Sequence, residues 1–172
     1  ESRVFYGFPT DPGLYAAEVA PIIDEAIARH GPVEWRAGVL TNELHGHLGI
    51  YATIGVKMGI RAREYFNIGV DDILVTTYAG HNPPISCMND GLQVGTGASV
   101  GHGLITVAEN VTPRPEARFT FKNKLCFLVQ LYLHITDNSA HLLKYACKRY
   151  HSDRHYSILK LVCQLSELSC SL

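Results

Sequence analysis

The sequence has no long apolar run, no excess of charge of either sign and no paired cysteine motif. Its 15 Lys and Arg against 16 Asp and Glu give a formal net charge of -1, so we expect no bulk electrostatic attraction to nucleic acid. The longest apolar stretch, residues 125–133, is interrupted by Gln130 and is much shorter than the ~18–20 residues of a membrane-spanning helix. The sequence therefore predicts no nucleic-acid partner and no membrane span.

The five cysteines are odd in number and include no Cys-x-x-Cys pair. This pattern indicates neither a disulfide framework nor a zinc ribbon, and it favours a reducing compartment such as the cytoplasm. Because the first residue is Glu1 rather than Met, we expect any original targeting segment to be out of view. What the chain has in excess is histidine, with nine residues, and histidine binds metals and titrates near neutral pH.

The order of the expected elements predicts an α+β fold, with a central, mostly antiparallel sheet packed by helices. Strands are expected over residues 73–78, 104–107, 117–121 and 125–131. Helices are expected over residues 14–29, 45–66, 86–94, about 139–150 and 152–168. We expect residues 1–132 to form the core domain and residues 133–172 a C-terminal helical extension.

Two details of the helices follow from local signals. Gly31-Pro32 is expected to end the first helix, and a loop containing Trp35 should then lead to a cap at Thr41-Asn42-Glu43. From residue 48 to residue 60, the helix expected over 45–66 is apolar almost all round apart from Lys57, and it contains spaced glycines. Such a helix is expected at the centre of the fold, where neighbouring backbone approaches it closely.

Two imidazoles flank a glycine in His45-Gly46-His47, where this helix is expected to begin. Side chains two residues apart point about 200° apart around a regular helix, so the pair converges on one atom only if the backbone bends at Gly46 or the helix starts after it. Two interpretations stay open: both rings bind a metal, or one caps the helix and the other is a buried hydrogen-bonded residue.

A cysteine and an aspartate follow in Cys87-Met88-Asn89-Asp90, after an irregular loop that contains His81. A thiolate together with imidazoles suits zinc, and a helix start would lower the pKa of the Cys87 thiol. The alternative is that Cys87 is a small buried apolar residue.

Glycines dominate the segment that follows, which includes Gly95-Thr96-Gly97 and Gly101-His102-Gly103. Successive amides of such a loop could form an anion-binding nest. The segment matches neither the dinucleotide-binding nor the phosphate-loop pattern. It could equally be a turn that packs tightly under the sheet.

Taken together and in this order, these segments resemble the FmdE family of formylmethanofuran dehydrogenase proteins. The resemblance covers about residues 41–125 and rests on four pieces: His45-Gly46-His47-Leu48, Cys87-x-x-Asp90-x-x-Gln93-Val94-x-Thr96-Gly97, Gly101-x-Gly103-x-Ile105 and the strand Phe119-Thr120-Phe121. It implies an α+β core, usually dimeric, in which His and Cys side chains hold a metal in a cleft. The family often has Cys-Pro where this chain has Gly49-Ile50, and a cysteine where it has Ala98.

The resemblance to this family also implies a function. We expect a divalent metal, with zinc favoured, held by His45, His47 and Cys87, and His81 or His102 in reserve. Cys87 and Asp90 are the expected catalytic residues, with Asp90 as a partner of the ligands or as a base, and the substrate would be a small carbonyl or amide compound. The alternative is a non-catalytic cofactor-binding or structural subunit of an oxidoreductase complex, in which Gly95, Thr96 and Gly97 hold the cofactor. A small-molecule ligand and a homodimer are expected in either case.

Overall fold

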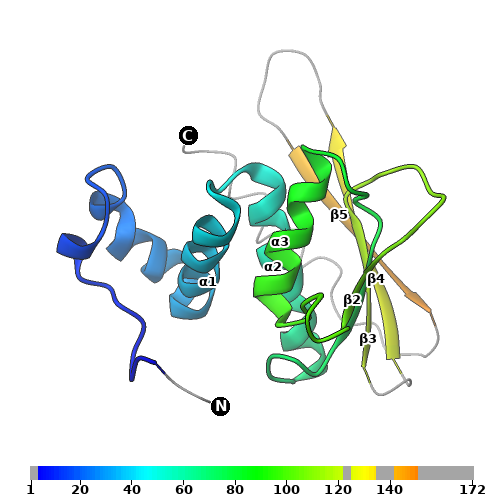
Figure 1. Cartoon of the computed structure of the whole chain (residues 1–172), viewed down its shortest axis with the longest axis horizontal. Coiled ribbons are helices and arrows are strands. Elements are labelled where there is room, and N and C mark those ends of the chain that lie inside the picture. The colour runs from blue at the N-terminus through cyan, green and yellow to red at the C-terminus, as the bar shows by residue number, and fades with distance from the viewer. Residues whose placement is uncertain (1–3, 122–124, 135–141, 151–172) are drawn as a thin grey trace.

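The computed structural model describes residues 4–121, 125–134 and 142–150, with side chains described through residue 121. The helices all lie on one face of a sheet, and α1 forms the layer farthest from it (Figure 1). The fold is therefore α+β, as the order of elements predicts.

Three α-helices make up the helical side: α1 (Ile23–His45), α2 (Ile50–Phe66) and α3 (Met88–Thr96). Three short 3-10 turns accompany them, at Pro12–Leu14, Ala20–Ile22 and Ile85–Cys87. Within the described part of the chain, no helix has both the length and the apolar character needed to cross a membrane.

The sheet contains five strands in the order β2-β1-β3-β4-β5. Its strands are β1 (Leu74–Thr77), β2 (Ile105–Val107), β3 (Glu116–Phe121), β4 (Leu125–His134) and β5 (Leu142–Tyr150). β2 is parallel to β1, whereas the pairs β1–β3, β3–β4 and β4–β5 are antiparallel. The mostly antiparallel sheet and its first four strands are thus confirmed.

The core lies between the sheet and the pair α2–α3. Ala117 and Phe119 of β3 are fully buried, whereas Arg118 between them is exposed, because alternate residues of a strand face opposite sides. The buried apolar cluster of this layer comprises Ile54, Met58, Ala62, Ile73, Val75, Ala79, Met88, Leu92, Ala98, Ile105, Ala117 and Phe119. This packing fixes the position of α3 on the sheet.

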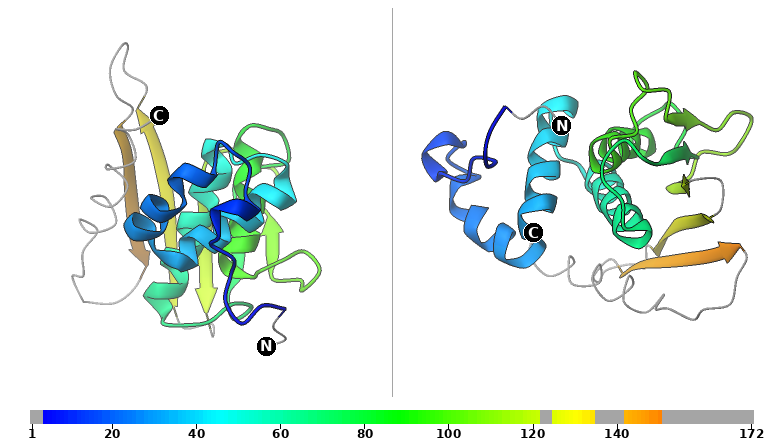
Figure 2. Two further views of the ribbon diagram at one scale, coloured as in Figure 1. Left: turned by 90° about the vertical axis from the view of Figure 1, so that its left-hand side faces the viewer. Right: turned by 90° about the horizontal axis from the view of Figure 1, so that it is seen from below.

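The first helix differs from the expectation at both ends. Residues 14–22 contain only short turns, and α1 begins at Ile23. At Gly31-Pro32 the helix does not end but bends sharply, with Gly31 at φ 82° and ψ 160°. The right-hand view of Figure 2 shows this bend in α1. The helix then resumes through Trp35, where a loop and a later cap were expected. Proline suits the first turn of a helix, and burial of Ala37 against α2 stabilises the resumed segment.

The expected continuous helix over 45–66 is also wrong, because the chain breaks between His45 and Ile50. Gly46 adopts φ 82°, and its N–H donates to the Asn42 carbonyl at 2.8 Å. This is the left-handed glycine cap that ends helices. His45 therefore closes one helix rather than opening the next.

The C-terminal helix expected over about 139–150 is wrong for residues 142–150, which form β5. β5 pairs with β4 in antiparallel register, with Val129 opposite Cys147. Pairing with a neighbouring strand overrides local helix preference, and a local sequence pattern does not include that neighbour. The helix expected over 152–168 lies outside the described residues, and the division at residue 132 stays a prediction.

Glycines bring α2 and α3 into direct backbone contact, as the spaced glycines of the central helix predict. A methyl group placed on Gly59 would lie 3.0 Å from the backbone carbon of Gly95, and one placed on Gly91 would lie 2.7 Å from the Val56 nitrogen. Contacts this short exclude any side chain larger than hydrogen. The close crossing sets where the first turn of α3 meets the end of α1.

Candidate functional site

His45 and Asp90 form the centre of the candidate site. The Nδ1 atom of His45 lies 2.6 Å from Oδ2 of Asp90, and the two side chains are 16% and 33% exposed. His45 ends α1 and Asp90 lies in the first turn of α3. The structure makes Asp90 the hydrogen-bonding partner of an imidazole, and its two expected roles, partner of a metal ligand or base, stay predictions.

The other ring nitrogen of His45, Nε2, is buried and has no hydrogen-bond partner. A buried polar atom without a partner is rare in folded proteins and calls for an explanation. Metal-binding histidines commonly use one ring nitrogen for the ion while the other donates to a carboxylate, which fixes the ring. The His45–Asp90 pair has this form, so His45 fits a metal ligand through Nε2.

His47 lies beside this pair in the break between α1 and α2. Its ring centroid is 4.7 Å from that of His45, with the planes inclined by 44°. The turn at Gly46, one of the two conditions under which this spacing lets the rings converge, brings them together. His47 is exposed, so solvent reaches the site from this side.

Cys87 lies directly before α3 as its N-cap residue and is a half-buried free thiol. It precedes Asp90 by three residues, so the two share one side of the helix start. Asn89 fastens this start to the sheet, because its amide donates to the Gly80 carbonyl at 2.9 Å and accepts from the Thr77 hydroxyl at 2.8 Å.

The three expected metal ligands, His45, His47 and Cys87, do not form one metal-binding group. Among the residues that the structure describes, no set of three or more His, Cys, Asp or Glu side chains is placed to hold a metal ion. The structure thus unites His45 with Asp90 and brings His47 close. It does not add Cys87 to them in a ligand group.

The two reserve histidines lie elsewhere. His81 is exposed in the loop before α3. His102 lies beyond the opposite end of α3, where its Nδ1 is 3.4 Å from Asp71 Oδ1 and 3.3 Å from the Gly97 carbonyl. His102 therefore does not face the His45–Asp90 pair.

The residues expected to hold a cofactor have packing and capping roles. Gly95 is buried against Val56 and Gly59 of α2. The Thr96 hydroxyl donates to the Leu92 carbonyl at 2.6 Å and accepts from the Ala98 amide at 3.0 Å, and Gly97 caps α3 with φ 79°. Cofactor binding at these residues stays a prediction.

A buried charge cluster between α1 and α2 was not expected. Glu34 forms ion pairs with Lys57 and, at 3.3 Å, with Arg61, and its carboxylate lies 3.5 Å from His30 Nδ1. Burial and then the nearby Lys57 charge lower the pKa of His30 from its usual 6.5. Lys57, the single charge within the apolar stretch 48–60 of this helix, was the only sequence signal for this cluster.

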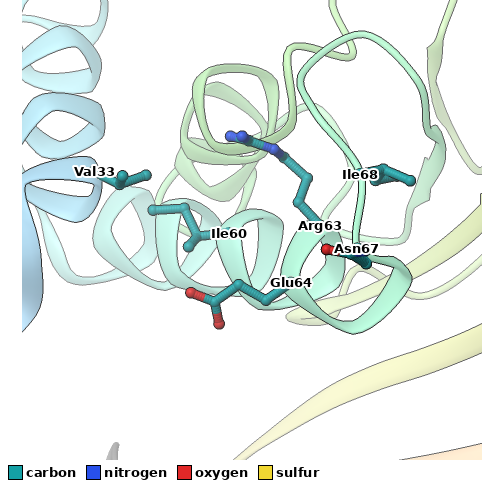
Figure 3. A pocket seen from close by; sticks show the side chains of 6 residues that line it. All are labelled: Val33, Ile60, Arg63, Glu64, Asn67 and Ile68. Carbon is teal, nitrogen blue, oxygen red and sulfur yellow. The ribbon is translucent and has the colours of Figure 1, made fainter.

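A cavity of about 240 Å³ lies near the C-terminal end of α2 (Figure 3). Its lining residues are Val33, Ile60, Arg63, Glu64, Asn67 and Ile68. Arg63 donates to the Gly95 carbonyl at 3.3 Å, and Glu64 is paired with Arg61. The cavity shares no residue with the His45–Asp90 site, which lies at the other end of α2.

Comparison with known families now adds to this geometry. The family model "FmdE, Molybdenum formylmethanofuran dehydrogenase operon" matches residues 44–164. The chain belongs to the FmdE family. The match begins one residue before His45 and includes His47, Cys87 and Asp90, so it contains every residue of the candidate site. No curated protein sequence matches the chain.

Proposed function

We propose that this FmdE-family chain binds a divalent metal ion, with zinc favoured, at the site centred on His45. The observation that carries the proposal is the buried, unpartnered Nε2 of a ring whose Nδ1 is held by Asp90. Among the described residues, none forms a hydrogen bond with this nitrogen. His47 is the second proposed ligand, and Cys87, which the structure does not group with the two histidines, is proposed as the third.

The chemistry follows from the proposed ligands. A zinc ion with three protein ligands and one open position polarises carbonyl groups as a Lewis acid. We therefore infer a small carbonyl or amide compound as the substrate. Asp90 keeps the His45 ring in place, and Cys87 lies at the N-terminus of α3.

Metal analysis of the purified full chain tests the proposal. We expect about one zinc per chain by elemental analysis after purification without chelator, and little or none in His45→Ala. His30→Ala is the matched control, because it removes an imidazole from the same helix at a place that the proposal does not use. A wild type that binds no zinc, or a His45→Ala variant that keeps its zinc, would sink the proposal.

The catalytic part needs its own measurement. We expect the zinc-loaded chain to turn over a member of a panel of small amides and aldehydes, followed by NMR, and Cys87→Ser to lower the rate. A zinc-binding chain that changes none of them would instead be the non-catalytic subunit.

A subunit role is the second candidate, and an apolar surface beside the site favours it. Leu40, Leu44, Leu48 and Ile50 are 40–60% exposed, and exposed apolar groups of this kind mark interfaces. The family description, which refers to a formylmethanofuran dehydrogenase operon, agrees with a subunit role in an oxidoreductase complex.

We propose that this surface also forms a homodimer, and light scattering of wild type and Leu44→Glu tests this proposal. A wild-type monomer would contradict the dimer.

A further inference from the structure

Gln93 has no role in the proposed metal chemistry, yet its side chain connects the candidate site to the glycine-rich loop. Its Nε2 donates to Oδ1 of Asp90 at 3.3 Å. Its Oε1 accepts from the backbone N–H of Val100 at 3.2 Å. A chain of hydrogen bonds therefore runs from Val100 through Gln93 and Asp90 to His45.

Two groups determine the direction of the bonds in this chain: the backbone N–H of Val100 and the ionised carboxylate of Asp90. A backbone N–H only donates, so the oxygen of the Gln93 amide must face Val100 and its nitrogen must face Asp90. An ionised carboxylate only accepts, so the hydrogen between Asp90 and His45 lies on Nδ1 of the ring. In the neutral ring Nε2 then keeps its lone pair. This is the buried atom without a partner.

We propose that Gln93 is a positioning residue for His45. It holds the Asp90 carboxylate in the orientation that keeps the ring hydrogen on Nδ1, and it makes this orientation depend on the loop at Val100. The effect on metal affinity rests on the proposed function, whereas the effect on the tautomer of His45 does not. The glycine-rich segment thus acts on the site through a hydrogen bond.

The test compares the full-length wild type with Gln93→Met and Ser99→Ala. Methionine matches glutamine in length and can replace neither bond of the amide, while the half-exposed position of Gln93 lets the variant fold. Ser99→Ala is the control in the same loop, because the Ser99 hydroxyl accepts from the His102 N–H at 3.2 Å and does not touch Gln93.

Two readouts are taken on each protein. The first is the ring-nitrogen NMR spectrum of His45 in the metal-free chain, at a pH where the ring is neutral. We expect the hydrogen on Nδ1 in wild type and Ser99→Ala, and a substantial Nε2–H population in Gln93→Met. The second is the zinc Kd from competition with a chelator. Loss of an outer partner of a metal ligand weakens affinity roughly 10–100-fold, and we expect such a change only in Gln93→Met.

The outcomes separate the positioning role of Gln93 from the proposed metal function. An Nε2–H ring in wild type, or a Gln93→Met variant with an unchanged tautomer, overturns the role of Gln93. An equal loss of zinc affinity in Ser99→Ala with the hydrogen still on Nδ1 of His45 also overturns it, because the loop would then act on the site by a route other than Gln93 and Asp90. A tautomer change in a chain that binds no zinc supports Gln93 as a positioning residue and overturns the metal function alone.

Discussion

Gly55 of α2 and Gly91 of α3 face each other where the two helices cross. A methyl group on Gly55 would lie 2.8 Å from the Leu92 nitrogen and 3.1 Å from the carbonyl carbon of Gly91. Because neither residue has a side chain, the helices touch through their backbones. Asp90, the neighbour of Gly91, is thereby brought to within hydrogen-bonding distance of His45.

Gly91→Ala should therefore both destabilise the fold and damage the site. Overpacking a tight contact typically costs about 1–3 kcal/mol, and we expect the upper part of that range in urea unfolding, with weaker zinc binding. Gly38→Ala is the matched control on α1, where a methyl group would meet only Leu48 Cδ2 at 3.8 Å. It should stabilise by roughly 0.5–1 kcal/mol, because alanine is the better helix former. Equal effects of the two changes would refute the close crossing.

The buried ion pair of Glu34 and Lys57 predicts a non-additive pair of substitutions. Glu34→Leu leaves Lys57, only 7% exposed, without its nearest carboxylate, which should cost about 3–5 kcal/mol in the free energy of unfolding. The double variant Glu34→Leu/Lys57→Met should cost clearly less, since no lysine charge is then left buried. Glu25→Ala, which removes an exposed ion pair with Arg29, should change stability by less than about 1 kcal/mol. A double variant as unstable as the sum of its single changes would contradict this account.

The lowered pKa of His30 predicts a loss of stability in mild acid. Burial and the charges of Lys57, Arg29 and Arg61 lower this pKa below the usual 6.5, and Glu34 only partly opposes them. Between the folded pKa and 6.5 the unfolded chain binds more protons, so the free energy of unfolding falls as the pH drops through this window. His30→Gln should flatten that part of the curve, measured by urea unfolding at several pH values, while His81→Gln in the exposed loop should not. An unchanged slope in His30→Gln would argue against a shifted His30.

Thr41 and Thr96 are both fully buried threonines that should respond oppositely to loss of the hydroxyl. The Thr41 hydroxyl has no partner, so Thr41→Val removes an unsatisfied group and should stabilise by about 1 kcal/mol. Thr96→Val loses the bonds to Leu92 and Ala98 and should destabilise by a similar amount, about 1 kcal/mol. Thermal unfolding of both variants provides the comparison, and destabilisation by Thr41→Val would show that its hydroxyl is bonded.

Local patterns predicted the first four strands, because β-branched residues between turn signals mark a strand over a short range. β1 and β3 were expected within one residue of their ends, since alternate residues such as Ala117 and Phe119 face the core. The first helix and the last strand could not be predicted from local patterns. The resumption of α1 after Pro32 depends on packing of Ala37 against α2, and β5 depends on pairing with β4. Neither partner is adjacent in the sequence.

The candidate site shows the same contrast between what the local sequence predicts and what tertiary contacts decide. His45, His47, Cys87 and Asp90 were all expected from residue type and family resemblance. Their arrangement was not, because the bond between His45 and Asp90 joins residues 45 positions apart. The Gln93 amide was visible only as part of a motif, and its two partners became apparent once α3 and the following loop were placed.

The sequence by itself determined the α+β class, the membership of the chain in a family and the residue types available for chemistry, since these depend on local pattern and composition. The tertiary structure decided which of those residues meet. It did so through the backbone contact of Gly55 and Gly91, the left-handed turn at Gly46 and the bend at Gly31. Each sets the direction of a helix, and the direction of a helix decides whether side chains distant in sequence come within reach of one hydrogen bond.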